Sequence, residues 1–239
     1  MSTDDFEGPE MTATTSPYRP AAAPSPAFWR APFSASTYRE VGFVLTGLPT
    51  ALLGFVLVVA LLPLGLGLVV TALGLPVLAL MLTAARGLGA LDRERVRTLL
   101  GTPVTAPAPV RPARSGFWGG ITARLADPDG WRAALYHVLM LPWAITSFVT
   151  TVVFLVTGWV LALYPAYHWV FHRYLDWPGY RVVEFTNGKG EYYAYYVTSP
   201  LQIAGVSLVG IALVLLTPKI VRGLTGVHRL AVRGLLGAR

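Results

Sequence analysis

A run of 45 residues without a charged side chain, from Val41 to Ala85, is the feature that most restricts how this chain can fold. About 20 apolar residues cross a bilayer once, so this run is long enough to cross it twice. One Pro and two Gly within residues 62–67 interrupt the run and predict a tight turn. We therefore expect one membrane span at about 41–61 and a second at about 66–85.

Two further apolar runs, at about 135–163 and 201–217, predict a third and a fourth span. Hydrophobic residues make up 54% of the chain and charged residues only 13%, about half the charged share of a soluble domain. Lipid is the solvent that such a composition favours. The expected fold class is an all-α membrane protein with four transmembrane helices.

The basic residues predict the orientation of these spans, because Lys and Arg collect in cytoplasmic loops. Three lie between the third and fourth spans: Arg173, Arg181 and Lys189. Many more precede the first span, separate the second from the third, or follow the fourth. We expect a multi-pass protein of the cell membrane with both termini and the middle loop in the cytoplasm.

Two segments outside the spans have the composition of irregular chain. Residues 1–27 are acidic at first and then rich in Pro, Ala, Ser and Thr, which predicts a disordered N-terminal tail and argues against a signal peptide. Residues 102–116 contain several Pro and predict a cytoplasmic linker. The net charge of +7 follows from Arg residues beside the spans, so nucleic-acid binding is not expected.

The two halves of the chain resemble each other, which predicts tandem repeats over 28–101 and 117–239. Tyr38-Arg39 and Trp131-Arg132 are each followed, at the same spacing, by Leu-Pro. Segments 86–101 and 222–237 match at nine of sixteen positions without a gap. Because each unit is expected to cross twice, we predict parallel repeats related by an axis along the membrane normal.

Each repeat ends in a segment with Arg on one side and Leu or Val on the other. These segments, 86–101 and 219–237, predict amphipathic cytoplasmic helices at the inner membrane surface. A simple anchoring role is the alternative. The candidate contacts to lipid headgroups or to a protein partner are Arg86, Arg93, Arg97, Arg222, Arg229 and Arg233.

Small residues recur every four positions in the first span, at Gly42, Thr46, Thr50 and Gly54. Such a strip favours close packing between helices. No predicted span carries a charge in its interior, which argues against proton- or ion-coupled transport.

The extracytoplasmic loop at 165–200 holds the most distinctive exposed chemistry. Aromatic residues crowd its start, and two β-prone runs around Asn187-Gly188 predict a small β-hairpin. This loop is either a sensing or partner-binding surface or a structural cap. The candidate surface residues are Tyr167, His168, His172, Trp177, Tyr192, Tyr193, Tyr195 and Tyr196.

The chain lacks the sequence patterns of common active sites. It has no Cys, and none of the nucleotide-binding, hydrolase or zinc-protease motifs occurs. His168 and His172 are spaced as metal ligands can be, but two His alone do not define a site. We expect no cofactor, no metal and no enzymatic activity.

The aromatic-Arg pairs, the early Leu-Pro and the Arg-rich ends in Leu-Leu-Gly resemble the sensor domain family of actinobacterial membrane proteins. In that family this four-helix module often precedes a histidine kinase, joined after the second Leu-Leu-Gly. Here only Ala238 and Arg239 follow, so the resemblance implies a stand-alone module that signals through another protein.

The expected function is therefore that of a non-enzymatic membrane sensor or signalling module. It would couple a stimulus outside the cell or in the membrane to a cytoplasmic partner. The partner implied is a separate histidine kinase or transcription regulator, beside the lipid bilayer itself and a further copy of the chain. A small transporter or permease component and a membrane scaffold are the alternatives.

Overall fold

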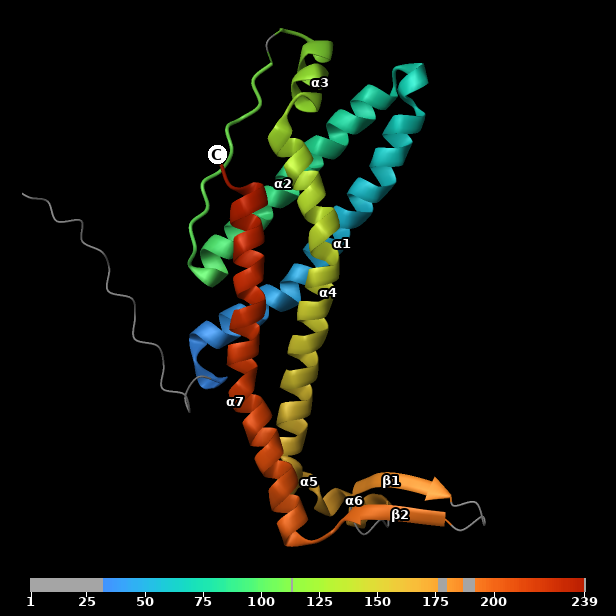
Figure 1. Cartoon of the computed structure of the whole chain (residues 1–239), viewed down its shortest axis with the longest axis vertical. Coiled ribbons are helices and arrows are strands. Elements are labelled where there is room, and N and C mark those ends of the chain that lie inside the picture. The colour runs from blue at the N-terminus through green and yellow to red at the C-terminus, as the bar shows by residue number, and fades with distance from the viewer. Residues whose placement is uncertain (1–31, 113, 176–179, 187–191, 239) are drawn as a thin grey trace, which may run out of the picture.

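Four long helices form the body of the protein (Figure 1). The computed structural model describes residues 32–112, 114–175, 180–186 and 192–238, without the side chains at 172, 175, 182, 185, 186 and 192–195. All four helices are long and apolar enough to cross a membrane. They are α1 (Ala35–Gly67), α2 (Gly74–Leu100), α4 (Pro128–Ala162) and α7 (Pro200–Ala231). The predicted tail 1–27 lies outside the described residues.

Local sequence signals set where these helices begin and end. The Asp127 side chain accepts a hydrogen bond from the backbone N–H of Gly130 at the start of α4. Ser199 and Gln202 form a reciprocal capping box at the start of α7. At the other end of α2, Gly101 adopts a left-handed backbone with φ 62°, a conformation that costs glycine little.

The first turn lies about six residues later than predicted. Helix α1 continues through Pro63 to Gly67, and the chain reverses over residues 68–73, which include the short 3₁₀ helix η2 (Val69–Thr71). A proline inside an apolar helix is tolerated where neighbouring groups satisfy the carbonyl that it frees. The Pro-Gly signal therefore marked the last turns of α1 and not the reversal itself.

The Arg-rich segments are helical, as predicted, but they are not separate helices. Segment 86–101 continues α2 without a break. Segment 219–237 continues α7 beyond Pro218 and ends in the π-helix η3 (Val232–Leu236). Their direction is thus set by the spans that they extend, and their location at the inner membrane surface stays a prediction.

Helices α1 and α2 lie side by side in opposite directions from Gly47 to the turn. A Cβ at Gly47 would contact Arg95, and one at Gly65 would contact Leu78. Since 47 pairs with 95 and 65 with 78, Arg86 is level with about residue 56 of α1. Both helices of this hairpin are therefore free of charge only from that level to the turn. This part covers about 11 residues of α1, a length of roughly 16 Å at 1.5 Å per residue.

Helices α4 and α7 form a longer charge-free hairpin. Their backbones approach closely where Gly158 faces Val214 and Gly210 faces Ala162. The Ser207 hydroxyl donates to the carbonyl of Ala162 at 2.9 Å. From Pro200 to Pro218 no charged residue occurs, a length of about 28 Å that matches the hydrocarbon core of a bilayer.

The two hairpins pack in opposite directions. Phe33, before α1, contacts Trp159 near the end of α4, with ring centroids 6.0 Å apart. Further along α1, Gly54 meets His137 near the start of α4. Helices α1 and α4 therefore run antiparallel, and the predicted parallel relation of the repeats is not confirmed: sequence similarity shows which residues correspond, but not the direction in which the halves pack.

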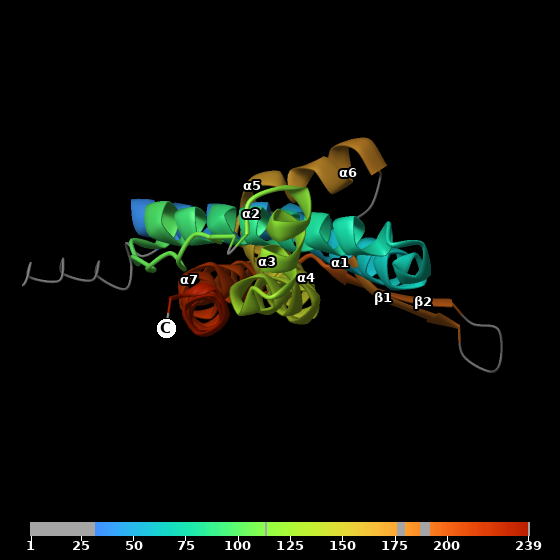
Figure 2. The same cartoon turned by 90° about the horizontal axis from the view of Figure 1, so that it is seen from above.

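Two layers result from this packing, with the α1–α2 pair on one side and the α4–α7 pair on the other (Figure 2). The core lies where the layers cross and includes Phe43, Met81, Leu82, Tyr136 and Val221. The linker after α2 passes along the bundle to the short helix α3 (Phe117–Leu125), which precedes α4 (Figure 1).

A small unit stands at the far end of the α4–α7 hairpin. It contains two short helices, α5 (Tyr164–Tyr167) and α6 (Trp169–Leu175), and the antiparallel strands β1 (Tyr180–Thr186) and β2 (Tyr192–Val197). The predicted β-hairpin is thereby confirmed, with Thr186 paired to Tyr192. The residues predicted to form its turn lie outside the described residues.

Candidate functional site: a polar cluster between the hairpins

Four polar side chains and one aromatic ring gather where the two layers cross. This crossing cluster consists of Phe43 from α1, Asp92 and Arg95 from α2, Tyr136 from α4 and His228 from α7. Asp92, Tyr136 and His228 are 3%, 1% and 7% exposed. Burial of ionisable groups is costly unless they are paired, so each must find partners here.

Arg95 connects the two helices of the first hairpin. Its guanidinium contacts the Asp92 carboxylate at 2.6 Å and donates to the carbonyl of Phe43 at 2.7 Å. It also donates to the hydroxyls of Thr46 at 3.0 Å and Thr50 at 2.8 Å. The strip of small residues that was predicted to pack against another helix thus contacts the charged side chain of Arg95. The first span has no charge of its own, but α2 brings Asp92 and Arg95 against it.

Tyr136 and His228 connect the two helices of the second hairpin. The Tyr136 hydroxyl lies 2.9 Å from Nε2 of His228, and the Asp92 carboxylate of the other hairpin lies close enough to act on it electrostatically. A hydroxyl can donate or accept, so this hydrogen bond can form with either tautomer of the imidazole. The ring of Phe43 meets His228 edge to face at 5.0 Å. The hydrogen bond of Tyr136 therefore joins α4 to α7.

The contacts of the crossing cluster are reciprocal between the repeats. The repeat alignment equates Phe43 with Tyr136 and Asp92 with His228. Phe43 of the first half contacts His228 of the second, and Tyr136 of the second half lies close to Asp92 of the first. Such exchange is the pattern that a two-fold relation between two similar halves produces.

A second polar contact joins the hairpins at the start of α1. The Glu40 carboxylate, 8% exposed, lies 3.5 Å from Nε of Arg222 and 3.8 Å from an Nη of Arg229. Both Arg residues extend from α7 and are candidate headgroup contacts. Their charges are partly balanced by Glu40, and their side chains remain 39% and 33% exposed.

The other candidate Arg residues divide between internal and exposed positions. Arg86 pairs with Asp127 and donates to the carbonyl of Ala108 at 2.6 Å. Arg93 donates to the carbonyl of Leu236 at 3.3 Å. Arg97 and Arg233 are exposed, with Arg97 paired to Glu94 three residues earlier. Arg86 and Arg93 therefore hold the helix ends together and present little charge to the surface.

The outer unit is fastened to the helices by tyrosines. Tyr164, 3% exposed, donates to the carbonyl of Val197 at 3.4 Å and accepts from the N–H of Tyr180 at 3.2 Å. Tyr167 donates to the carbonyl of Val160 at 2.9 Å, and burial raises the pKa of its hydroxyl. This arrangement positions the β-hairpin beside the end of α4.

The structure describes only part of the predicted sensing surface. His168 is exposed and its Nδ1 lies 2.9 Å from the carbonyl of Pro165, while Tyr196 is half-buried on β2. Trp177 lies outside the described residues. For His172, Tyr192, Tyr193 and Tyr195 the structure describes the backbone alone. Within the described residues, no group of three potential metal-ligating side chains gathers.

Sequence reasoning did not find the crossing cluster. Asp92 and Arg95 lie in a segment predicted to be an exposed amphipathic helix, and His228 and Tyr136 are 92 positions apart. One signal was available: the repeat alignment places polar residues at corresponding positions of both copies, Asp92 in one and His228 in the other.

One of the comparisons with known proteins found a match. A family model described as "Putative sensor" matches residues 43–236, which is most of the chain and covers all four long helices in large part. No match was found among curated proteins or among solved structures. The extent of the family match confirms the resemblance drawn from the sequence: this chain belongs to the "Putative sensor" family.

Proposed function

We propose that the protein is a non-enzymatic membrane sensor or signalling module that couples a stimulus outside the cell or in the membrane to a cytoplasmic partner. The observation that carries this proposal is the continuity of one helix. Helix α7 begins at Pro200, next to the outer β-hairpin, and runs on through η3 to Leu236. A displacement at its outer end can therefore be transmitted along one continuous helix to the cytoplasmic end.

The polar contacts give such a displacement two discrete outcomes. Movement of α7 must break and re-form the pairs of Glu40 with Arg222 and Arg229, and the bond of Tyr136 with His228. Packed interfaces with hydrogen-bonded partners switch between arrangements and do not deform continuously. The contact of η3 with Arg93 extends the same path to the end of α2.

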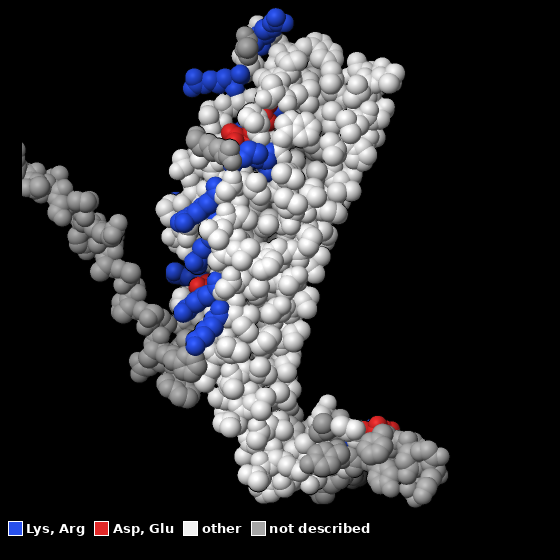
Figure 3. Space-filling view, viewed as in Figure 1, with Lys and Arg blue, Asp and Glu red and all other residues white. Residues whose placement is uncertain are grey.

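In this proposal both termini and the linker 102–116 face the cytoplasm. An extended backbone has no partners for its polar groups in lipid, so the side along which the linker runs must face water. Lys and Arg side chains collect along one side of the molecule (Figure 3). One water-facing side would thus hold the linker and the Arg-rich helix ends, which supports a common cytoplasmic location.

The partner we infer is a separate cytoplasmic signalling protein, either a histidine kinase or a transcription regulator. The contact surface proposed is the exposed end of α2 and η3, where Arg97 and Arg233 lie. A further copy of the chain is a second possible partner, because many large apolar side chains of α1 and α4 are exposed.

A distance measurement tests the coupling without knowledge of the stimulus. The chain has no Cys, so Arg97→Cys with Arg233→Cys provides a single pair of spin-label sites. Replacing strand residues 181–186 and 192–196 with Gly-Ser perturbs only the outer unit. A sensor predicts a changed distance distribution between the cytoplasmic labels, measured in nanodiscs by pulsed electron spin resonance.

The same labels in the unperturbed chain, and in a Tyr174→Phe variant of the outer unit, serve as controls because Tyr174 is 72% exposed. An unchanged distribution after strand replacement would favour a scaffold. Solute flux in proteoliposomes, absent from empty vesicles, would favour the transporter alternative and contradict the proposal.

A further inference from the structure

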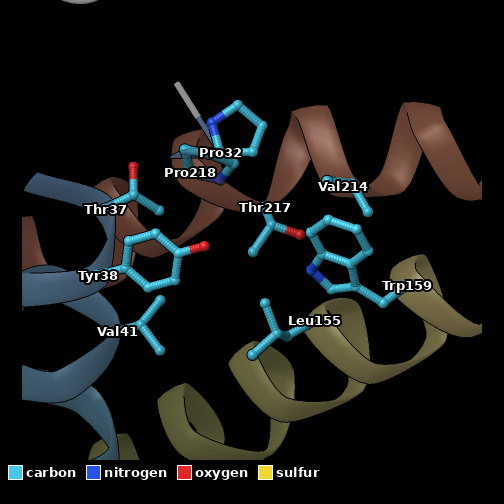
Figure 4. A pocket seen from close by; sticks show the side chains of 9 residues that line it. All are labelled: Pro32, Thr37, Tyr38, Val41, Leu155, Trp159, Val214, Thr217 and Pro218. Atoms are coloured by element: carbon cyan, nitrogen blue, oxygen red, sulfur yellow. The ribbon is translucent and has the colours of Figure 1, made fainter. Parts of the chain in front are cut away.

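An apolar groove opens between the start of α1 and the middle of the second hairpin (Figure 4). It encloses about 50 Å³ and continues past Trp159 and Val214 into a second cavity of about 260 Å³. The second part is lined by Phe33, Ala162, Ile211 and Leu215, among others. The combined groove follows α7 toward the outer unit and is bounded almost wholly by hydrocarbon.

Two hydrogen-bond donors stand at the edge of this groove. The Tyr38 hydroxyl and the indole N–H of Trp159 both face the space between α1 and the second hairpin (Figure 4). Neither has a hydrogen-bond partner among the side chains and backbone groups that the structure describes. An apolar body with a few polar groups at its rim is the usual form of a small-molecule site.

Cations lie directly beyond the groove. Ile211, Leu215, Pro218 and Arg222 follow one face of α7 at spacings of three or four residues, so Arg222 continues the groove wall by one helical turn. Lys219 is exposed beside it. Where Arg222 and Arg229 meet Glu40, two cations against one carboxylate give a charge of 2 − 1 = +1.

The groove thus lies where a charged surface changes to an apolar one. Figure 3 shows Lys and Arg along the upper part of the molecule and none over the lower part of α4 and α7. In sequence, neither 133–162 nor 200–218 contains a charged residue. This is the position of a phospholipid at a membrane surface, with its headgroup at the cations and its chain among the apolar side chains.

We propose that the groove binds an anionic phospholipid. Its phosphate lies at Arg222 and Lys219, its ester region at Tyr38 and Trp159, and an acyl chain along Leu155, Val214 and Leu215. The excess charge of +1 at Glu40, Arg222 and Arg229 favours an anionic headgroup over a neutral one. An apolar segment of a second copy would fill the groove but supply no anion for that excess. The site bridges the two hairpins and does not rest on the proposed signalling function.

Lipid retention by the full-length protein tests the proposal. The protein is equilibrated with mixtures of phosphatidylglycerol and phosphatidylcholine, and bound lipid is counted by native mass spectrometry. We expect phosphatidylglycerol to be preferred, and Arg222→Gln to reduce that preference about fivefold, the effect of roughly one cation near an anionic surface. Arg233→Gln is the matched control, since it removes an exposed Arg from the far end of the same helix.

Glu40→Gln separates lipid binding from a merely structural role of Arg222. It breaks the same pair but leaves the guanidinium without its carboxylate, so retention of phosphatidylglycerol should rise. A fall in both Glu40→Gln and Arg222→Gln would show that only the bridge between hairpins matters, and would overturn the proposal.

The apolar part is tested by Leu215→Trp, which fills the groove, and by Trp159→Phe, which removes the rim N–H together with part of the ring system. The first should abolish retention of both lipids, and the second should weaken it while the protein keeps its unfolding temperature. Displacement of the lipid by inorganic phosphate would identify a simple anion site. Equal losses in Arg222→Gln and Arg233→Gln would indicate unspecific surface charge. Either result contradicts the proposal.

Discussion

The hydroxyl of Tyr136 lies 2.9 Å from Nε2 of His228, and this contact joins α4 to α7 in the middle of the protein. Both side chains are buried, and Asp92 from the other hairpin lies close to the same hydroxyl. Side chains from three of the four long helices therefore gather around this oxygen atom.

Removing that oxygen should destabilise the protein. In Tyr136→Phe the imidazole of His228 loses its partner while it stays buried, at a cost of about 1–3 kcal/mol. Unfolding in mixed detergent micelles, followed by circular dichroism, measures the change. Tyr174→Phe, at a 72% exposed position, should leave the unfolding free energy unchanged. Equal stability of both variants would show that the bond contributes nothing.

The stability contributed by the ion pair of Asp92 and Arg95 should require both side chains. Asp92→Asn or Arg95→Met alone leaves a buried charge without its partner, which typically costs about 3–5 kcal/mol. The double variant removes both charges and should recover most of that loss. The same detergent titration, arranged as a double-mutant cycle, gives the coupling energy. Additive losses would mean that the two side chains act independently.

Gly54 should not tolerate a side chain. A Cβ there would overlap the imidazole of His137, so Gly54→Ala must separate α1 from α4, at roughly 1–3 kcal/mol. Gly42 lies on the same helix with open space around it, and Gly42→Ala should be neutral or stabilise by up to about 1 kcal/mol. Thermal unfolding of the two variants in parallel decides between packing and helix propensity.

The proposed orientation can be checked with single thiols, because the chain has no Cys of its own. Ser115→Cys in the linker and Arg233→Cys near the C-terminus should react with an impermeant maleimide only after the cells are opened. Val183→Cys on β1 should react in intact cells. Labelling of residue 115 in intact cells would place the linker outside and reverse the proposed orientation.

Tyr164 should hold the outer β-hairpin against the helices. Tyr164→Phe loses the bonds to Val197 and Tyr180, so the strands should become more accessible to protease. Limited trypsin digestion, which cleaves after Arg181, reports the change as a faster rate. Tyr180→Phe is the control, since its hydroxyl is not the group bound by Tyr164. Identical rates would indicate that packing alone holds the strands.

Composition and periodicity were sufficient to predict the helices. Charge-free runs identified all four, and β-prone residues around Asn187-Gly188 identified the hairpin of β1 and β2. These features depend on neighbours in sequence. The turn after α1 was placed too early because Pro63 is compatible with a helix whose surroundings satisfy the freed carbonyl.

The relation between the hairpins depends on contacts that no local pattern encodes. The meeting of Gly54 with His137 sets α1 and α4 antiparallel, and those residues are 83 positions apart. Likewise, the offset between α1 and α2 that brings Arg95 to Thr46 and Thr50 follows from the length of the turn. The register of two packed helices can be determined only once the residues in contact are known.

Phe43 lies against His228, and Tyr136 lies close to Asp92, so corresponding positions of the two halves face different partners. Two identical hairpins paired about a two-fold axis would carry the same residue twice at each such position, two carboxylates or two imidazoles. Here the corresponding positions carry one Asp and one His, and Arg95 stands where the other half has Ala231. The two halves of one chain are therefore chemical complements of each other, which two identical hairpins could not be.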